Sequence, residues 1–340
     1  MNRIDLKNIN IRTDLIVETI SDKKYITNEN VDNIKISRVT IDKDNKDLLN
    51  KKEGNYVTIE FNDITNYEDR EKVGKVLENE IKNILELNKI KDNDECLIIG
   101  LGNVKSTPDA LGPKVITNIL VTRHLFELNL DVKKGLRSVG TMIPGVMGNT
   151  GIETTDIIYA VINKIKPKFI IVIDSLCSSS VERINKTIQL TDTGIHPGSG
   201  IGNTRKEISK TTVKIPVIAI GVPTVVESST IVNETINYLF LHLNYLKNNY
   251  EKSKLIVRRF DNYLDKIKKD DISIEDRELL GGIIGSLNDF DKKNLISEVL
   301  ESVNYNMIVT PKEIDFVIDK ISNLISNSIN NALHKEIDNY

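Results

Sequence analysis

Apolar residues recur with two different spacings along this chain, and each spacing predicts one kind of element. Between residues 68 and 87 they return every three or four positions, which is typical of a helix with one buried face. Between Ile34 and Ile41 they nearly alternate with polar residues, and residues 56–61 are also strand-like. The first 30 residues lack sustained periodicity, so no structure is predicted for them.

The middle of the chain alternates between strands and helices. Residues 96–99 form a short apolar strand that runs into Gly100, and residues 169–173 form a continuous apolar run of the kind buried on both faces of a sheet. Other predicted elements are helices at 111–126, 153–165 and 229–246, and strands at 188–191 and 216–220. Residues 95–246 are therefore predicted to form a layered α/β domain.

The carboxyl-terminal third is predicted to be a charged connection followed by helices. Residues 247–271 are rich in charge and are expected to be exposed, and residues 274–335 are mostly helical in pattern. Thr310 and Pro311 mark a helix start, with the threonine as cap and the proline in the first turn.

Composition indicates a folded protein and excludes several classes. The 340 residues are 39% hydrophobic and 28% charged, and the net charge of -3 does not point to direct nucleic-acid binding. Two cysteines are too few for a disulfide framework and fit a reducing compartment. Because there is no secretory signal and no run approaching the roughly 20 apolar residues of a membrane span, we expect a cytoplasmic protein with no membrane partner.

Two carboxylates follow the predicted strands of the α/β region. Asp109 lies in the glycine-rich loop 100–113 after the first strand, and Asp174 follows residues 169–173 directly. In an open α/β sheet, loops beyond the carboxyl ends of the strands converge on the active site. Two nearby carboxylates resist ionising together, so such a pair activates water and protonates a leaving amine. A simpler interpretation is that each acid only stabilises a helix start.

Other motifs are weaker indicators of chemistry. The Gly100-Leu101-Gly102 turn lacks the third glycine of a dinucleotide-binding loop. Asp192-Thr193-Gly194 matches the aspartic-protease tripeptide, but only one copy is present, so a turn is the simpler interpretation. His196, in the next turn, is expected to line the site together with Asn103. No zincin motif occurs, but Asp109, Asp174 and His196 leave a mixed divalent-metal site open.

Several long motifs, in the same order and with similar spacing, resemble the spore germination protease family over nearly the whole chain. They are residues 11–15, 100–113, 121–126, 143–148, 192–202, 215–221 and 307–313. The resemblance implies a self-processing endopeptidase that starts the degradation of small acid-soluble proteins, which protect spore DNA, during germination. It also implies a homotetramer located in the spore core or forespore.

The same resemblance implies a zymogen with a propeptide at residues 1–14, cut between Asp14 and Leu15. Residues 15–340 would then form one α/β peptidase domain with a core at 95–246. Its fold is expected to be similar to that of hydrogenase maturation peptidases: a layered sheet with helices on both faces, added amino-terminal strands and a helical region at 274–335.

The family's proposed catalytic aspartates fall on Asp109 and Asp174, one to activate water and one to donate a proton. Residues 175–179, Ser-Leu-Cys-Ser-Ser, depart from the expected alanine and arginine after the second aspartate. No cofactor is firmly implied. Two alternatives stay open: a hydrolase that uses the same acids to hold a divalent metal, and a non-catalytic binding protein on this scaffold.

Overall fold

The computed structural model describes residues 13–20, 22–46, 51–128, 130, 132–197, 206–248 and 272–335. The chain divides into two compact units. The larger comprises Arg12–Ser178, Glu182–Val225 and Thr310–Tyr340, and the smaller is built mainly from Val226–Val309. Most of the predicted connection at 247–271, and the predicted propeptide up to Arg12, lie outside the described residues. In the part of the chain that is described, no helix is both long and apolar enough to cross a membrane.

A mixed sheet forms the centre of the larger unit, with strand order β1-β2-β3-β7-β8-β6-β4-β5 along the described path. The strands are β1 (Thr27–Val31), β2 (Ile34–Ile41), β3 (Gly54–Glu60), β4 (Cys96–Gly100), β5 (Val139–Met142), β6 (Phe169–Ser178), β7 (Thr187–Thr191) and β8 (Val217–Glu227). Strand β4 runs parallel to both β5 and β6, whereas β1, β2, β3 and β7 form an antiparallel extension. The predicted α/β fold is confirmed.

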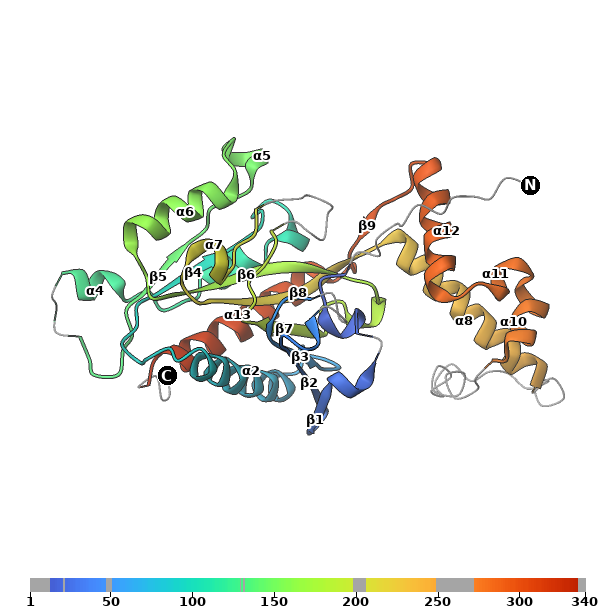
Figure 1. Ribbon diagram of the computed structural model, residues 1–340, viewed down its shortest axis with the longest axis horizontal. Helices are drawn as coiled ribbons and strands as arrows, with labels where there is room; N and C mark the ends of the chain where they lie inside the picture. The colour runs from blue at the N-terminus through green and yellow to red at the C-terminus, as the bar shows by residue number, and fades with distance from the viewer. Residues whose placement is uncertain are drawn as a thin grey trace. The chain divides into compact units, whose positions relative to one another are not determined.

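Helices cover both faces of this sheet (Figure 1). Helices α2 (Tyr67–Leu87) and α13 (Ile314–Leu333) lie side by side on one face, where Phe169 and Ile171 of β6 join their core. Helix α6 (Thr154–Ile165) covers the other face, where Ile170 and Val172 point. The side chains on the two faces of β6 thus pack in two separate hydrophobic cores, as its continuous apolar run predicts.

The structure corrects three predicted boundaries. The helix expected at 111–126 is broken into α3 (Leu111–Ile116) and α4 (Arg123–Glu127). The helix breaks because Thr122 forms hydrogen bonds with residues 137–139 and not within a helix. Its N–H donates to the Val139 carbonyl, 3.0 Å away, and its hydroxyl donates to the Arg137 carbonyl, 2.5 Å away. Helix α13 begins at Ile314, so Thr310 is not its cap, and the Thr310 hydroxyl donates to the Thr224 carbonyl.

The third correction concerns the strand predicted at 169–173. Strand β6 continues to Ser178, so Asp174 lies inside a strand and neither begins a loop nor caps a helix. Predicted helices at 68–87 and 153–165 are confirmed as α2 and α6, and the helix at 229–246 is confirmed as α8 (Ser228–Asn248).

The smaller unit is helical. It contains α8, α10 (Ile274–Gly281), α11 (Ile283–Ser286) and α12 (Asp289–Ser302), and the short strand β9 (Ile308–Val309) pairs with Val226 and Glu227 at the end of β8. The Lys292 ammonium is 2% exposed and donates to Asn237 at 2.5 Å and to Asp289 at 2.9 Å. These bonds compensate the ammonium for lost solvation.

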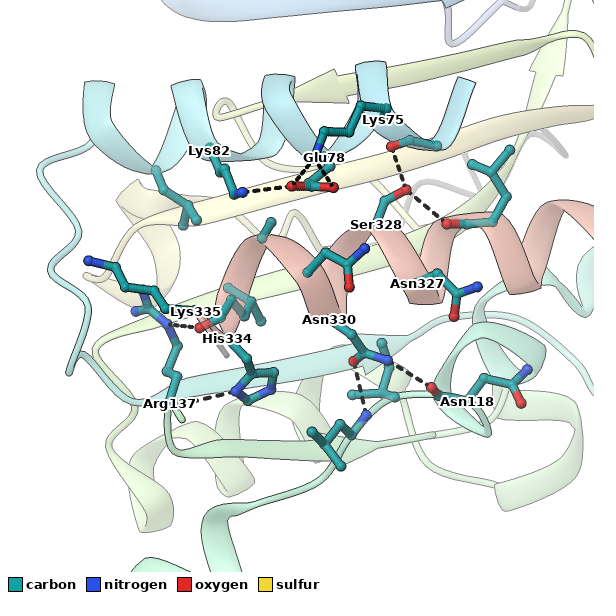
Figure 2. Close-up of a pocket in the computed structure, with 18 of the residues that line it drawn as sticks. Lys75, Glu78, Lys82, Asn118, Arg137, Asn327, Ser328, Asn330, His334 and Lys335 are labelled. Atoms are coloured by element: carbon teal, nitrogen blue, oxygen red, sulfur yellow. Dashed lines mark hydrogen bonds and ion pairs between the residues drawn. The ribbon is translucent and has the colours of Figure 1, made fainter. Parts of the chain in front are cut away.

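The carboxyl end of α13 closes a large polar hollow of about 1480 Å³ between α2, α13 and the loops at 117–120 and 135–137 (Figure 2). Its polar groups mostly bind one another. Glu78 accepts from Lys75 and Lys82, and Ser328 donates to the Gly74 and Leu324 carbonyls. Asp109 and Asp174 do not line this hollow.

His334 lies at one end of this hollow and is held neutral. The ring is 3% exposed, and its Nδ1 accepts from the Arg137 backbone N–H at 3.1 Å. Burial, with a smaller contribution from the Arg137 charge, lowers the pKa of His334 to about 4. Protonation would also place a hydrogen on the nitrogen that accepts this bond.

His334 should therefore make stability depend on pH. Since its folded pKa lies below its unfolded value, its contribution is complete above about pH 6.5 and is lost as the pH falls towards about 4. We expect His334→Gln, whose amide oxygen still accepts, to remove up to about 3 kcal/mol of this pH dependence. Urea unfolding at about pH 7.5 and about pH 4.5 measures it. The exposed His124→Gln serves as control, and an unchanged pH dependence in His334→Gln would contradict the assignment.

Candidate active site

The loop after β4 presents Asp109 from a tight turn. The single helical turn η3 (Thr107–Asp109) closes when the Asp109 N–H donates to the Ser106 carbonyl at 2.8 Å. The Asn103 N–H donates back to the Asp109 carbonyl at 2.9 Å, so the loop folds over itself. Asp109 is half-buried, and these backbone bonds fix the turn on which it lies.

Glycine is required beneath this turn. Gly102 has φ of +116°, and a Cβ there would lie 1.9 Å from the Asp109 carbonyl oxygen. A Cβ on Gly112 would lie 2.3 Å from the Leu101 carbonyl oxygen and 2.7 Å from that of Ile173. The glycines therefore allow the Asp109 turn and the start of α3 to pack closely on the ends of β4 and β6.

Asp174 reaches the same end of the sheet from β6. It is 7% exposed, and its Oδ1 accepts from the Ser175 N–H at 2.9 Å. Strands β4 and β6 are parallel neighbours up to Gly100 and Ile173, and the Leu101 N–H donates to the Ile173 carbonyl at 2.8 Å. Asp174 thus lies one residue beyond the last pair of β4 and β6, and Asp109 lies in the loop that follows β4.

Asn103 fastens the Asp109 loop from outside. Its side-chain oxygen accepts from the Asn149 amide at 2.9 Å and from the Lys105 N–H at 3.1 Å. On the other side, the Thr224 hydroxyl of β8 donates to the Pro108 carbonyl at 2.7 Å. Asn103 therefore positions the Asp109 loop by joining it to the segment around Asn149.

A groove of about 650 Å³ lies on the same face of the sheet as Asp174. Leu176 of β6, Gly221 of β8 and Gln189 of β7 form part of its floor. A Cβ on Gly221 would lie 2.5 Å from the Leu176 side chain, so glycine lets Leu176 cover β8 at this point. We call this hollow the sheet groove; its rim includes Thr13, Asp14, Lys46, Lys51, Lys52, Tyr56 and His196.

Residues 13–18 run along the sheet groove, and Thr13, Asp14 and Ile16 form part of its wall. Leu15 is 0% exposed and Ile16 is 1% exposed. The Asp14 N–H donates to the Cys177 carbonyl at 3.0 Å, and the Cys177 N–H donates to the Asp14 carboxylate at 2.9 Å. The extension of β6 beyond Asp174 therefore provides the backbone to which the amino-terminal segment binds.

Gln189 binds the backbone on both sides of Leu15. Its side-chain oxygen accepts from the Ile16 N–H at 2.6 Å, and its amide nitrogen donates to the Asp14 carbonyl at 2.9 Å. It is the only glutamine of the chain and is 7% exposed. Sequence reasoning missed it, although a polar residue between the buried Ile188 and Leu190 was a weak signal.

Glu18 is bound beyond Leu15 in a small polar subsite. Its carboxylate is 2% exposed and accepts from the Ser178 hydroxyl at 2.6 Å and from Arg183 Nη1 at 3.2 Å. The Thr13 hydroxyl also donates to it, and Arg183 is itself held by Glu60. Ser178, within the unusual run 175–179, therefore contacts the amino-terminal segment.

His196 faces the Asp14 side of the sheet groove. It is half exposed, and its Nε2 lies 3.1 Å from the Lys52 ammonium and 3.8 Å from the Glu207 carboxylate. Burial, and then the charge of Lys52, lower the pKa of His196, which favours the neutral imidazole. The rest of its loop, 198–205, lies outside the described residues.

The Asp192-Thr193-Gly194 tripeptide is structural, as the turn interpretation predicts. The Asp192 carboxylate accepts from the Asn55 N–H at 2.7 Å, from the Asn55 amide at 2.9 Å and from the Asn88 amide at 3.0 Å. Gly194 takes a φ of +90°. This aspartate joins the start of β3 to the residue after α2.

Among the described residues, no group of three or more histidine, cysteine or carboxylate side chains is gathered as a metal ion would need. Asp109, Asp174 and His196 therefore do not fit the mixed metal site that the sequence left open.

Comparison of the sequence with known proteins shows the family to which the chain belongs. A family profile described as germination protease matches residues 9–340. The chain belongs to the germination protease family. It is 42% identical to the germination protease of Bacillus cereus (strain ATCC 10987 / NRS 248), over 98% of this chain and 96% of that protein. Its identity to the Bacillus velezensis germination protease is 44%, over 99% and 96%. Membership in the germination protease family makes the chain a spore germination endopeptidase.

Gly102→Ala tests whether this germination protease depends on the packing beneath Asp109. The added methyl group and the left-handed backbone should cost about 1–3 kcal/mol and shift the Asp109 turn. A shift of about 1 Å at a reacting group costs roughly 100-fold in rate. Thermal unfolding and peptidase assays measure both effects. Gly148→Ala has nothing within 4 Å of its Cβ and is the control; equal activity in the two variants would contradict the role of Gly102.

Proposed function

We propose that this germination protease is a self-processing endopeptidase that cuts its own chain between Asp14 and Leu15. The observation that carries the proposal is the binding of residues 13–18 along the wall of the sheet groove, by backbone and side-chain hydrogen bonds to Cys177 and Gln189, beside the strand that carries Asp174. A peptide whose backbone is held on both sides of one bond is presented as a substrate at that bond. The same groove would bind the small acid-soluble spore proteins whose degradation the enzyme initiates.

Asp109 and Asp174 are the proposed catalytic acids. One carboxylate takes a proton from the attacking water, and the other gives a proton to the departing amine. Asp174 directly follows the last residue of β6 that pairs with β4, and Asp109 lies in the loop after β4. This placement supports a shared site, in which a carboxylate close to another is driven to keep its proton. We also propose that the fold is similar to that of hydrogenase maturation peptidases.

Cleavage would also open the sheet groove. It converts the Leu15 amide, at a residue that is 0% exposed, into a charged ammonium group. An unpaired charge in such a place costs several kcal/mol. The new amino terminus would therefore tend to leave, and the groove would accept a substrate in its place.

A homotetramer in the spore core or forespore completes the proposal. The smaller unit exposes many large apolar side chains, including Ile274 at 69%, Leu279 at 75% and Ile283 at 81%. Apolar surfaces of this kind mark interaction sites, and a further copy of the chain would cover them.

Substitution of the two acids tests the proposed mechanism. In the full chain, Asp109→Asn and Asp174→Asn should each lower the rate of cleavage at Leu15 by about 10²–10⁴-fold, because each removes an acid–base group. Mass spectrometry of the products measures the rate, and the exposed Asp319→Asn is the control. Both variants cutting at the wild-type rate would refute the mechanism. Loss of wild-type activity on chelation, with recovery on adding a divalent ion, would assign the acids to metal binding instead.

The Glu18 subsite should hold the segment in place. In an Asp174→Asn chain, Glu18→Gln weakens charge-assisted bonds to Ser178 and Arg183, each worth about 1.5–3 kcal/mol. We expect hydrogen exchange at the Asp14 and Ile16 amides to rise at least about tenfold. Glu29→Gln, at an exposed ion pair with Arg38, is the matched control. Unchanged exchange in Glu18→Gln would show that this subsite does not anchor the segment.

A further inference from the structure

We infer that Gln189 is a catalytic residue that stabilises the oxyanion formed when the Asp14–Leu15 bond is cut. The inference rests on the proposed function, since it assumes that this bond is the scissile one. It starts from one contact: the Gln189 amide nitrogen donates to the carbonyl oxygen of that bond at 2.9 Å.

Gln189 is placed for this role by the sheet. It pairs with Gly221 across β7 and β8, and Leu176 covers Gly221 from the other side. Asp174 lies two residues before Leu176 and therefore on the same face. The amide and the proposed acid thus lie on one face of the sheet, separated by a strand that has no side chain at Gly221.

The orientation of the amide is fixed by its second bond. Its oxygen accepts from the Ile16 N–H at 2.6 Å, so the nitrogen must face the Asp14 carbonyl. Both hydrogen bonds recorded for this side chain go to the backbone of the bound segment. Because these two hydrogen bonds go to backbone groups, Gln189 would hold any substrate peptide in the same register.

The hydrolytic step balances with this assignment. Water adds to the Asp14 carbonyl carbon, and the carbonyl oxygen takes the negative charge while facing the Gln189 N–H. The C–N bond to Leu15 then breaks, the oxygen re-forms the double bond, and a proton from the water passes to the Leu15 nitrogen through the acid pair. A donor already aimed at that oxygen, at a site 7% exposed, needs little reorganisation as charge develops.

Gln189→Glu in the full chain tests the inference. It keeps an acceptor for the Ile16 N–H but replaces the donor with a carboxylate oxygen. We expect the first-order rate of self-cleavage to fall by about 10²-fold or more, the usual effect of losing one oxyanion donor. Hydrogen exchange at the Ile16 amide, in the Asp174→Asn background, should change less than about tenfold. Gln189→Leu, which removes both groups, should be at least as slow.

Thr187→Val is the matched control, since Thr187 lies two residues earlier on the same strand and face and its hydroxyl has no partner among the described residues. A wild-type rate in a folded Gln189→Glu chain would overturn the inference alone. The inference would also be overturned if the self-cleavage rate fell by no more than the factor by which hydrogen exchange at the Ile16 amide rose. Gln189 would then only help to bind the segment before the reaction. A wild-type chain that leaves the Asp14–Leu15 bond intact would overturn the proposed function as well.

Discussion

Strand β6 is the element on which the rest of the structure depends. It is ten residues long, and all of it except Ser175 is buried. The side chains of its first five residues pack in two hydrophobic cores, one under α2 and α13 and one under α6. Its last five carry Asp174 and the backbone groups that bind Asp14. The same buried strand therefore stabilises the sheet and fixes the position of the proposed catalytic Asp174.

Close backbone packing at Gly102 and Gly112 is the second constraint, and it helps to fix the polar loop that carries Asp109. Gly102 and Gly112 let the Asp109 loop lie against the ends of β4 and β6 at distances that no side chain permits. Asn103 and Thr224 then fasten the loop from opposite sides. These contacts fix the backbone of the loop that carries Asp109.

The amino-terminal segment relates to the larger unit as a bound peptide does to a receptor. Its Leu15 and Ile16 are buried, its backbone is paired through Cys177 and Gln189, and its acid Glu18 forms an ion pair with Arg183. Lys51 and Lys52 lie on the same rim as Asp14, and burial lowers the pKa of Lys51.

The sequence alone determined the α/β class, the helices α2, α6 and α8, and the strands that carry the two acids, because these depend on local periodicity and on apolar runs. The resemblance of its motifs pointed to the family that the comparisons then established. It also marked residues 14 and 15, but it gave no reason to single out Gln189, Ser178 or Arg183. Those residues are distant in sequence from the segment they bind, and only the pairing of β7 beside β8 and β6 brings them to it. The length of β6 was likewise decided by tertiary structure: a polar run such as Asp174-Ser175 ends a strand by local preference. Here Leu101 binds Ile173 before this run and Asp14 binds Cys177 after it, and the strand continues to Ser178.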